Sequence, residues 1–95
     1  DGLLANARRD GLRLVLLWFA TWKNGDMDYA PDWVKSDPDR FRRVVAPSGQ
    51  PVWVLSSHCA ATLAADRAAF TALCAHLKAV DGQQGTVIAL QIENE

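Results

Sequence analysis

Two apolar runs rich in strand-forming residues frame this sequence, one at about 12–20 and the other at 86–95, with a long helical pattern before the second. The first run, LRLVLLWFA, is nearly continuous apolar sequence, which is typical of a strand buried on both faces. The second, TVIALQIENE, places Ile88, Leu90 and Ile92 on one apolar face that is suited to meet a helix. A strand, a helix and a second strand in this order predict a βαβ unit with parallel strands. We therefore expect an α/β fold.

The connecting helix is expected over residues 60–80. Its larger apolar residues recur at intervals of three and four and so share one face: Leu63, Phe70, Leu73, Cys74, Leu77 and Val80. Alanines fill many of the other positions and add helix propensity. Polar residues such as Asp66 and Lys78 are assigned to the other faces.

The segment before the first strand has the pattern of a helix end. Apolar residues at helical spacing precede Arg8 and Arg9, and Gly11 follows as a stop signal. The chain begins within this helix and ends at Glu95, directly after the second strand. We therefore expect the 95 residues to be a piece of a larger domain.

Residues 21–58 are expected to form a long loop that holds all four prolines and three of the four tryptophans. Only YAPDWVKSD and DPDRFRRVV carry short patterns, each typical of a single helical turn. Loops longer than about 15 residues without regular structure are usually functional. A disordered linker is the simpler alternative, but the aromatic content of this segment argues against it.

Polar residues at the end of the second strand are candidates for chemistry. The carboxyl ends of parallel strands meet at one edge of a sheet, so the start of the long loop and QIENE are expected to lie close together. Glu93 and Glu95 are expected to project to the same side of the strand, where like charge would raise the pKa of one carboxyl and let it act as an acid. Asn94 is suited to bind a sugar hydroxyl. The alternative is a solvated acidic terminus.

Aromatic residues around the long loop are suited to carbohydrate, because a sugar ring packs its C–H face on an indole. Six residues belong to this group: Trp18, Phe19, Trp22, Tyr29, Trp33 and Trp53. Core packing is the alternative, and we expect it for Phe19, Trp53 and one of Trp18 or Trp33. Trp22, just past the strand, is the best site candidate. Asn24 lies in an Asn-Gly turn and is also a candidate ligand contact.

Composition and missing motifs exclude several classes of function. Eleven acidic residues against ten basic ones give a net charge of −1, which leaves no electrostatic footprint for nucleic acid. The longest apolar stretch is too short to span a bilayer. Neither a phosphate-binding loop nor a nucleophile elbow is present. Cys59 and Cys74 are expected to be free buried thiols, and their spacing to the two histidines is not that of a zinc site, so we expect no metal and no cofactor.

The segments GLRLVLLWFATWKNG, YAPDWVK, ADRAAFTALCAHLK and TVIALQIENE together resemble part of a (β/α)8-barrel β-galactosidase of the glycoside hydrolase family 35 type, with family 42 more distant. The resemblance covers essentially the whole chain. It implies a partial TIM barrel in which 12–20 and 86–95 are the third and fourth strands. It also implies a retaining hydrolase whose substrate is a β-galactoside or a related glycan.

In that family the Glu after Asn in a strand ending Gln-x-Glu-Asn-Glu is the general acid/base. The resemblance therefore implies that Glu95 protonates the leaving oxygen, that Asn94 binds the hydroxyl next to the reacting carbon, and that Glu93 supports them. Trp22 and Asn24 are candidate substrate contacts from the residue pattern alone. The family's nucleophile is a Glu on the seventh strand, which this sequence does not include, so the isolated chain is expected to be inactive and poorly stable.

The chain also departs from the family pattern. Typical members carry a sugar-binding Glu in the loop after the third strand, where this chain has WFATWKNG, and the sugar is therefore left open. Related bacterial enzymes are often exported, but the sequence decides neither the compartment nor the oligomeric state. The alternative function is a small non-catalytic α/β module that binds carbohydrate or another partner.

Overall fold

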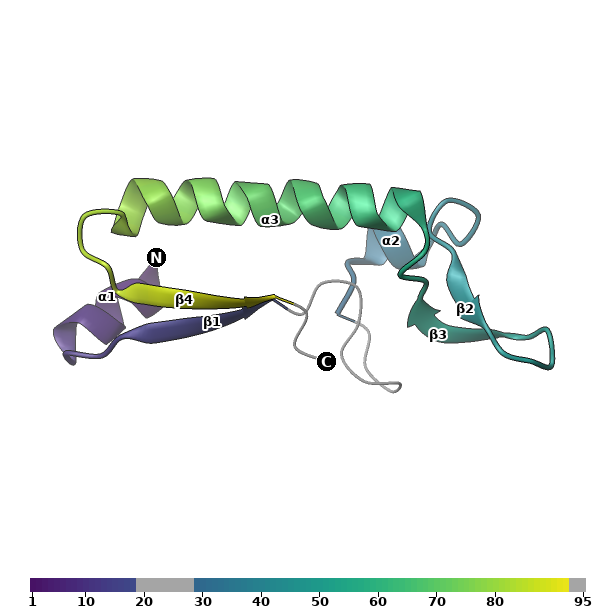
Figure 1. Cartoon of the computed structure of the whole chain (residues 1–95), viewed down its shortest axis with the longest axis horizontal. Coiled ribbons are helices and arrows are strands. Elements are labelled where there is room, and N and C mark those ends of the chain that lie inside the picture. Colours follow the sequence, from purple (N-terminus) through teal and green to yellow (C-terminus); the bar gives the residue numbers. More distant parts are fainter. Residues whose placement is uncertain (19–28, 93–95) are drawn as a thin grey trace.

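The computed structural model describes residues 1–18 and 29–92 of the chain. Its helices and strands are, in chain order, α1 (Gly2–Arg9), β1 (Leu14–Trp18), α2 (Asp32–Lys35), β2 (Arg43–Val45), β3 (Pro51–Leu55), α3 (Ala60–Asp81) and β4 (Val87–Ile92). The molecule measures 51 × 21 × 19 Å, and α3 runs along its long axis (Figure 1). α1, β1 and β4 lie toward the C-terminal end of α3, whereas α2, β2 and β3 lie at its N-terminal end (Figure 1). The fold is a small mixed α/β arrangement with two two-stranded sheets.

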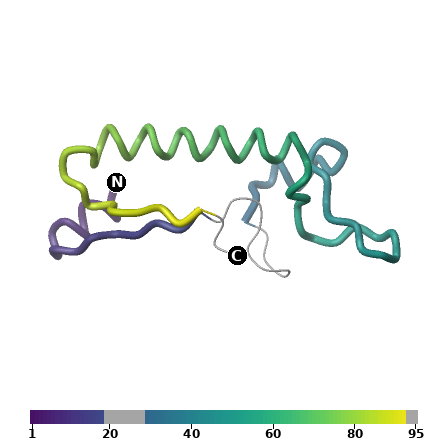
Figure 2. Tube along the Cα trace, viewed as in Figure 1, coloured from purple at the N-terminus to yellow at the C-terminus, as the bar shows by residue number. Residues whose placement is uncertain are grey.

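β1 and β4 pair in parallel, which confirms the predicted strand–helix–strand unit. The register joins Leu14 to Val87 at one end and Trp18 to Ile92 at the other, with an irregularity after Leu14. Figure 2 shows the two strands running together beneath the C-terminal half of α3. The rings of Trp18 and Phe70 lie 5.4 Å apart and join this sheet to the helix.

The prediction that the first strand is buried on both faces is wrong for the described residues. Leu14, Leu16 and Trp18 are half-buried, whereas Val15 and Leu17 between them are exposed. This alternation arises because successive side chains point to opposite faces and α3 covers one of those faces. The predicted helix-facing side of the second strand is also only partly covered, since Leu90 is half-buried while Ile88 and Ile92 are exposed.

α1 confirms the predicted helix end. Leu4 and Ala7 are its buried residues, and the chain leaves the helix through Gly11, which has a φ of +70°. The Gly11 N–H donates to the Arg8 carbonyl at 3.1 Å and the Leu12 N–H donates to the Ala7 carbonyl at 2.8 Å. This pair of bonds is the Schellman motif, whose left-handed position favours glycine.

α3 confirms the helix predicted over 60–80 and continues to Asp81. In its first turns, the buried face of α3 is not the predicted one. Leu63 was expected on the buried face but is 62% exposed, whereas Thr62 is buried. Ala65 lies one turn on from Thr62 and packs against the apolar cluster at this end, so the inward stripe runs through small residues here. Among the described helices, none combines the length and the hydropathy that crossing a bilayer requires.

Part of the segment predicted as one long loop, residues 21–58, is an antiparallel hairpin. β2 pairs with β3 so that Arg43 lies opposite Leu55 and Val45 lies opposite Pro51. The turn is closed by hydrogen bonds between Ala46 and Gln50 and between Ala46 and Gly49. Gly49 has a φ of +83°, the left-handed position that this kind of hairpin turn requires. The YAPDWVKSD segment forms the predicted single helical turn, α2.

A buried apolar cluster lies at the N-terminal end of α3. It comprises Ala30, Val34, Phe41 and Leu55, with Ala61 and Ala65 of α3 packed against it. Phe41 is 1% exposed, and its ring packs edge-to-face with the Trp33 ring, with the two ring centroids 5.4 Å apart. Trp53 is 73% exposed, so its predicted place in the core is wrong. It instead projects from the hairpin, where the Arg43 guanidinium lies over its ring.

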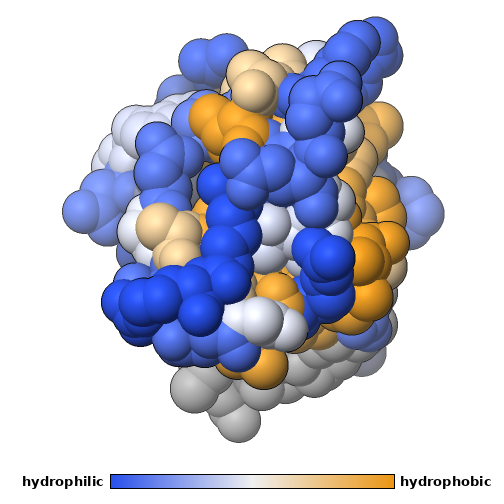
Figure 3. Space-filling view, turned by 90° about the vertical axis from the view of Figure 1, so that its left-hand side faces the viewer, coloured by the Kyte–Doolittle hydropathy of each residue, from blue (hydrophilic) through white to orange (hydrophobic). Residues whose placement is uncertain are grey.

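A polar network holds the opposite end of the molecule together. The Arg8 guanidinium donates to Asp81 Oδ1 at 2.6 Å, to Thr86 Oγ1 at 2.9 Å and to the Val80 carbonyl at 2.9 Å. Asp81 Oδ2 accepts the Val87 N–H at 2.7 Å. These donors, Arg8 foremost, hold the pKa of Asp81 far below its usual range. Figure 3 views this end of the molecule face on and shows hydrophilic residues over most of it, with apolar residues gathered along one side.

Candidate functional site

The carboxyl ends of β1 and β4 lie side by side. Trp18 is the last residue of β1 and pairs with Ile92, the last residue of β4. Residues 19–28 therefore continue the chain from the same sheet edge as residues 93–95. This edge is where sites form in parallel α/β folds.

The sequence-predicted site residues all lie outside the described residues. Glu93, Asn94 and Glu95 directly follow β4, and Trp22 and Asn24 fall within 19–28. Their predicted roles therefore stay predictions. The structure does describe the two residues that directly precede these segments, Trp18 at the end of β1 and Ile92 at the end of β4.

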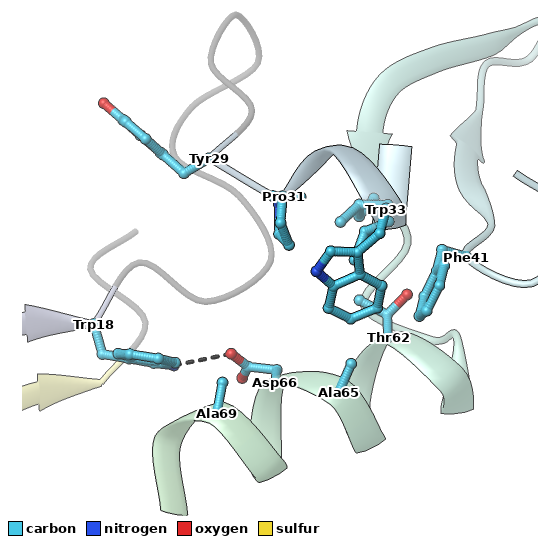
Figure 4. A pocket seen from close by; sticks show the side chains of 12 residues that line it. Trp18, Tyr29, Pro31, Trp33, Phe41, Thr62, Ala65, Asp66 and Ala69 are labelled. Carbon is cyan, nitrogen blue, oxygen red and sulfur yellow. Dashed lines mark hydrogen bonds between the residues drawn. The ribbon is translucent and has the colours of Figure 1, made fainter. Parts of the chain in front are cut away.

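A cavity of about 190 Å³ opens beside this strand edge. Trp18 forms one side, Pro31 and Trp33 form the other, and the side chains of Ala65 and Ala69 form the floor on α3 (Figure 4). Tyr29 also lines the cavity, but its ring points away from the centre (Figure 4). The cavity therefore brings together three of the predicted aromatic residues, Trp18, Tyr29 and Trp33, of which Trp18 and Trp33 form opposite sides.

Asp66 is the charged group of this cavity. Its Oδ1 accepts a hydrogen bond of 2.9 Å from the Trp18 indole N–H (Figure 4). The bond fixes the indole plane at the strand end, and the ring of Phe70, one helical turn on from Asp66 in α3, lies with its centroid 5.4 Å from that of the indole. Among the described residues, the second carboxylate oxygen accepts no hydrogen bond.

Two flat apolar walls and one carboxylate define what the cavity can bind. An indole face packs against the C–H face of a sugar or against an aromatic ring. A carboxylate oxygen accepts hydrogen bonds from ligand hydroxyl or amino groups. The volume lies below the range of about 300–1,000 Å³ typical of drug-sized ligands, so a single ring is the suitable size.

Sequence reasoning did not identify Asp66, because the helical pattern assigned it to a solvent-facing side. The spacing did contain a signal, since Asp66 stands four residues before Phe70 and one helical turn after Thr62, on the inward stripe. A carboxylate on that stripe needs a donor partner, and the indole N–H of a strand-end tryptophan is such a donor.

The cysteines and histidines form no candidate metal centre in residues 1–18 and 29–92, where no three metal-ligating side chains converge. Both cysteines are free thiols, as predicted, with Cys59 buried and Cys74 half-buried. His76 Nε2 lies 2.7 Å from Asp1 Oδ1 in an exposed pair.

No family model matches this chain, and no curated protein matches it.

Proposed function

We propose that this chain is part of the catalytic barrel of a retaining glycoside hydrolase of the β-galactosidase type. The proposal starts from the resemblance of the strand, loop, helix and QIENE segments to that family. It draws support from the mixed α/β fold, in which two parallel strands are joined through a long helix, as adjacent strands of a (β/α)8 barrel are.

The pairing of Trp18 with Ile92 is the observation that carries the proposal. It aligns the carboxyl ends of β1 and β4, the edge at which barrel enzymes place their catalytic groups. Exposed apolar residues on the uncovered sheet face, Val15 and Leu17 among them, are suited to the interior of a barrel. The unpaired edges of the two-stranded sheet are likewise suited to further strands.

In the proposed mechanism Glu95 protonates the oxygen of the departing group, and later removes a proton from the attacking water. Asn94 contacts the hydroxyl next to the reacting carbon, and Glu93 supports the arrangement. The nucleophile is a carboxylate from a later strand, outside these 95 residues, at the separation of about 5–5.5 Å that retaining enzymes use. No cofactor takes part.

The test is Glu95→Gln in the complete protein that the proposal implies. Loss of the acid is expected to reduce kcat/KM for an alkyl β-galactoside by about 100-fold or more. A substrate whose leaving group departs without protonation, such as a dinitrophenyl β-galactoside, is expected to lose much less in its first step. Asp39→Asn removes an exposed carboxylate and is the matched control. Near-normal activity of Glu95→Gln on the alkyl galactoside would contradict the role of Glu95.

The isolated 95-residue chain is expected to show no hydrolysis, because one carboxylate of the required pair is absent. It is also expected to melt without a sharp transition, since its exposed sheet face and edges lack partners. Assays with an aryl β-galactoside and a thermal melt by circular dichroism check both points. Measurable turnover by the isolated chain would contradict its expected inactivity, and a cooperative melt would contradict its expected low stability.

A non-catalytic carbohydrate-binding module is the second candidate, and the cavity between Trp18 and Trp33 favours it. On this proposal Ala69→Leu fills the floor and abolishes sugar binding, as followed by tryptophan fluorescence with methyl β-galactoside. Ala64→Leu adds the same side chain five residues earlier in α3, at an exposed position that does not line the cavity, and is expected to leave sugar binding unchanged. Binding that is equal in both variants would exclude the cavity as the site.

A further inference from the structure

Asp66 is a carboxylate without a counter-ion in the described part of the chain. It is half-buried on α3, and its Oδ1 accepts one hydrogen bond, from the neutral indole N–H of Trp18. The ion pairs among the described residues join other groups, and none of them includes Asp66. A carboxylate can accept about four hydrogen bonds, and removing its charge from water is unfavourable unless a cation or further donors lie near it. The charge of Asp66 is therefore only partly compensated.

The cavity at Asp66 has a lining of one sign of charge. Among the described residues that line it, Asp66 is the one that is charged at neutral pH, and the others are mostly apolar or aromatic. Figure 4 shows the carboxylate between Trp18 and Trp33. An apolar lining strengthens the field of a carboxylate, because less water is present to screen it. The cavity is therefore electronegative, which disfavours an anion and favours a cation.

The aromatic walls add to this attraction. The face of an aromatic ring carries partial negative charge, and a cation within about 6 Å of the ring centroid is attracted to it. Trp18 and Trp33 form opposite sides of the cavity (Figure 4), and tryptophan is the side chain that attracts cations most strongly in this way. The hydrogen bond from the Trp18 N–H to Asp66 also polarises the indole and makes its ring more electron-rich. A carboxylate and aromatic faces together are suited to recognise an organic cation.

The size and the polarity of the cavity indicate the kind of cation. Its volume of about 190 Å³ is several times the share of about 30 Å³ that one water occupies in the liquid, so a small organic ion is the suitable size. A metal ion needs several oxygen or nitrogen ligands, and no three metal-ligating side chains converge in residues 1–18 and 29–92. An ammonium ion that carries methyl groups needs few acceptors, and its methyl groups pack on apolar and aromatic side chains. A neutral sugar would leave the charge of Asp66 uncompensated.

We propose that this cavity binds a small methylated ammonium ion, with Asp66 as its counter-ion and the indoles of Trp18 and Trp33 as its walls. Binding is non-covalent, and the carboxylate is already oriented by the Trp18 N–H, which lowers the entropy that ordering the site would cost. The site goes beyond the proposed hydrolase activity, because it uses no residue of the QIENE segment and does not depend on the role of Glu95. It differs from the carbohydrate-binding candidate in the charge of the ligand.

The first test compares choline with its carbon analogue dimethylbutanol, which has the same shape without the charge. Binding to the protein at its full natural length is followed by tryptophan fluorescence and by calorimetry at fixed ionic strength. Choline is expected to bind at least about tenfold more tightly than the analogue. Equal affinities, or no saturable binding of choline, would overturn the proposal. Tighter binding of methyl β-galactoside than of choline would also overturn it, and would support the carbohydrate-binding candidate instead.

A charge variant tests the part of the carboxylate. Asp66→Asn removes the charge and keeps a side-chain oxygen that can accept the Trp18 N–H, so it is expected to weaken choline binding about tenfold and to leave the analogue unchanged. Asp39→Asn removes an exposed carboxylate that does not line the cavity, and this matched control is expected to alter neither affinity. Unchanged choline binding in Asp66→Asn, or an equal loss in both variants, would refute the part assigned to Asp66.

Two further measurements do not depend on how Asp66→Asn folds. Raising the potassium chloride concentration is expected to weaken the binding of choline to the native protein and to leave the analogue unchanged, because salt screens the carboxylate. Trp33→Leu replaces an indole that is 57% exposed with an aliphatic side chain, and is expected to weaken choline more than the analogue. Trp33→Phe keeps an aromatic face and is expected to retain most of the preference for choline. Parallel losses for the two ligands in either measurement would contradict recognition of the charge.

Discussion

The two ends of α3 are held by opposite kinds of interaction. At the C-terminal end, Arg8 joins α1 to Asp81 and Thr86 through charged hydrogen bonds. At the N-terminal end, Phe41 and Leu55 bring α2 and the hairpin onto the helix by apolar burial. A single polar triad organises the first end, whereas the second depends on the fit of several side chains.

This difference indicates how each end should respond to change. An ion pair with a buried partner depends on geometry and on protonation, so it is sensitive to pH and to the loss of one group. An apolar cluster is indifferent to pH in the acid range and sensitive to volume. The helix between the two ends is the element through which a perturbation at one end would reach the other.

Phe41→Ala is expected to have the largest effect, because removing a fully buried phenylalanine costs about 3–5 kcal/mol. That loss is of the order of the whole stability of a small domain. Amide hydrogen exchange should show lost protection in β2, β3 and α2 and retained protection in β1 and β4. Trp53→Ala removes an exposed aromatic side chain from the hairpin and should cost less than about 1 kcal/mol. Equal loss of amide protection at both ends would contradict the view that the apolar cluster stabilises only the N-terminal end of α3.

Acid should weaken the other end selectively. The folded-state pKa of Asp81 lies below its ordinary value of 3.8, mainly because Arg8 donates to the carboxylate. Its contribution to stability is therefore complete well above pH 4 and is lost as the pH falls through 3.8 toward the lower folded value. In the complete protein, urea midpoints at pH 6 and pH 2.5 should differ more with the native residue at position 81 than with Asp81→Asn. Asp10→Asn, at an exposed ion pair, should behave as the native chain does.

The smallest effects are expected at Gly11 and Gly49, two of the three described glycines with positive φ, which lie at opposite ends of the molecule. An added Cβ at Gly11 or Gly49 would meet no atom within 4 Å, so the cost of alanine is conformational, about 1–2 kcal/mol at each site. Gly11→Ala should loosen α1 and leave the hairpin unchanged, and Gly49→Ala should do the reverse. Gly2→Ala is the control, because Gly2 lies in α1 without positive φ and alanine favours helix. A change in amide protection at the end far from the substitution, in either variant, would show that α3 couples the two ends of the molecule.

Hydrophobic periodicity was sufficient to predict α3 and the parallel pair. Apolar residues at helical spacing over some twenty residues strongly indicate a helix. With a strand before and after that helix, few chain topologies other than a parallel pair are possible. The hairpin was missed although VVAPSGQPVWV contains Pro47 and Gly49 between two β-branched runs, which is a known hairpin signal. β2 is only three residues long, and its pattern resembled a helical turn with the preceding arginines.

The burial of β1 could not be predicted from its apolar sequence. Such a sequence is compatible with burial on both faces, but it does not show which helices or strands are present to cover each face. Val15 and Leu17 are exposed for that reason. The cavity itself was not predicted: Trp18 and Trp33 were in the aromatic group, but the carboxylate that orders Trp18 was assigned to another face of α3. The proposed roles of Glu93, Asn94 and Glu95 stay predictions that the variants above can test.

The pairing of Leu14 with Val87 has a consequence during synthesis. About seventy residues must be made between the two partners, which takes about 4–15 s at 5–20 residues per second. During that interval β1 lacks β4, its partner among the described residues, while α3 and the hairpin depend only on nearer contacts. A nascent chain would therefore carry the apolar β1 segment, not yet paired with β4, while the hairpin and α3 form, and this is the stage at which a chaperone or a neighbouring nascent chain would meet it.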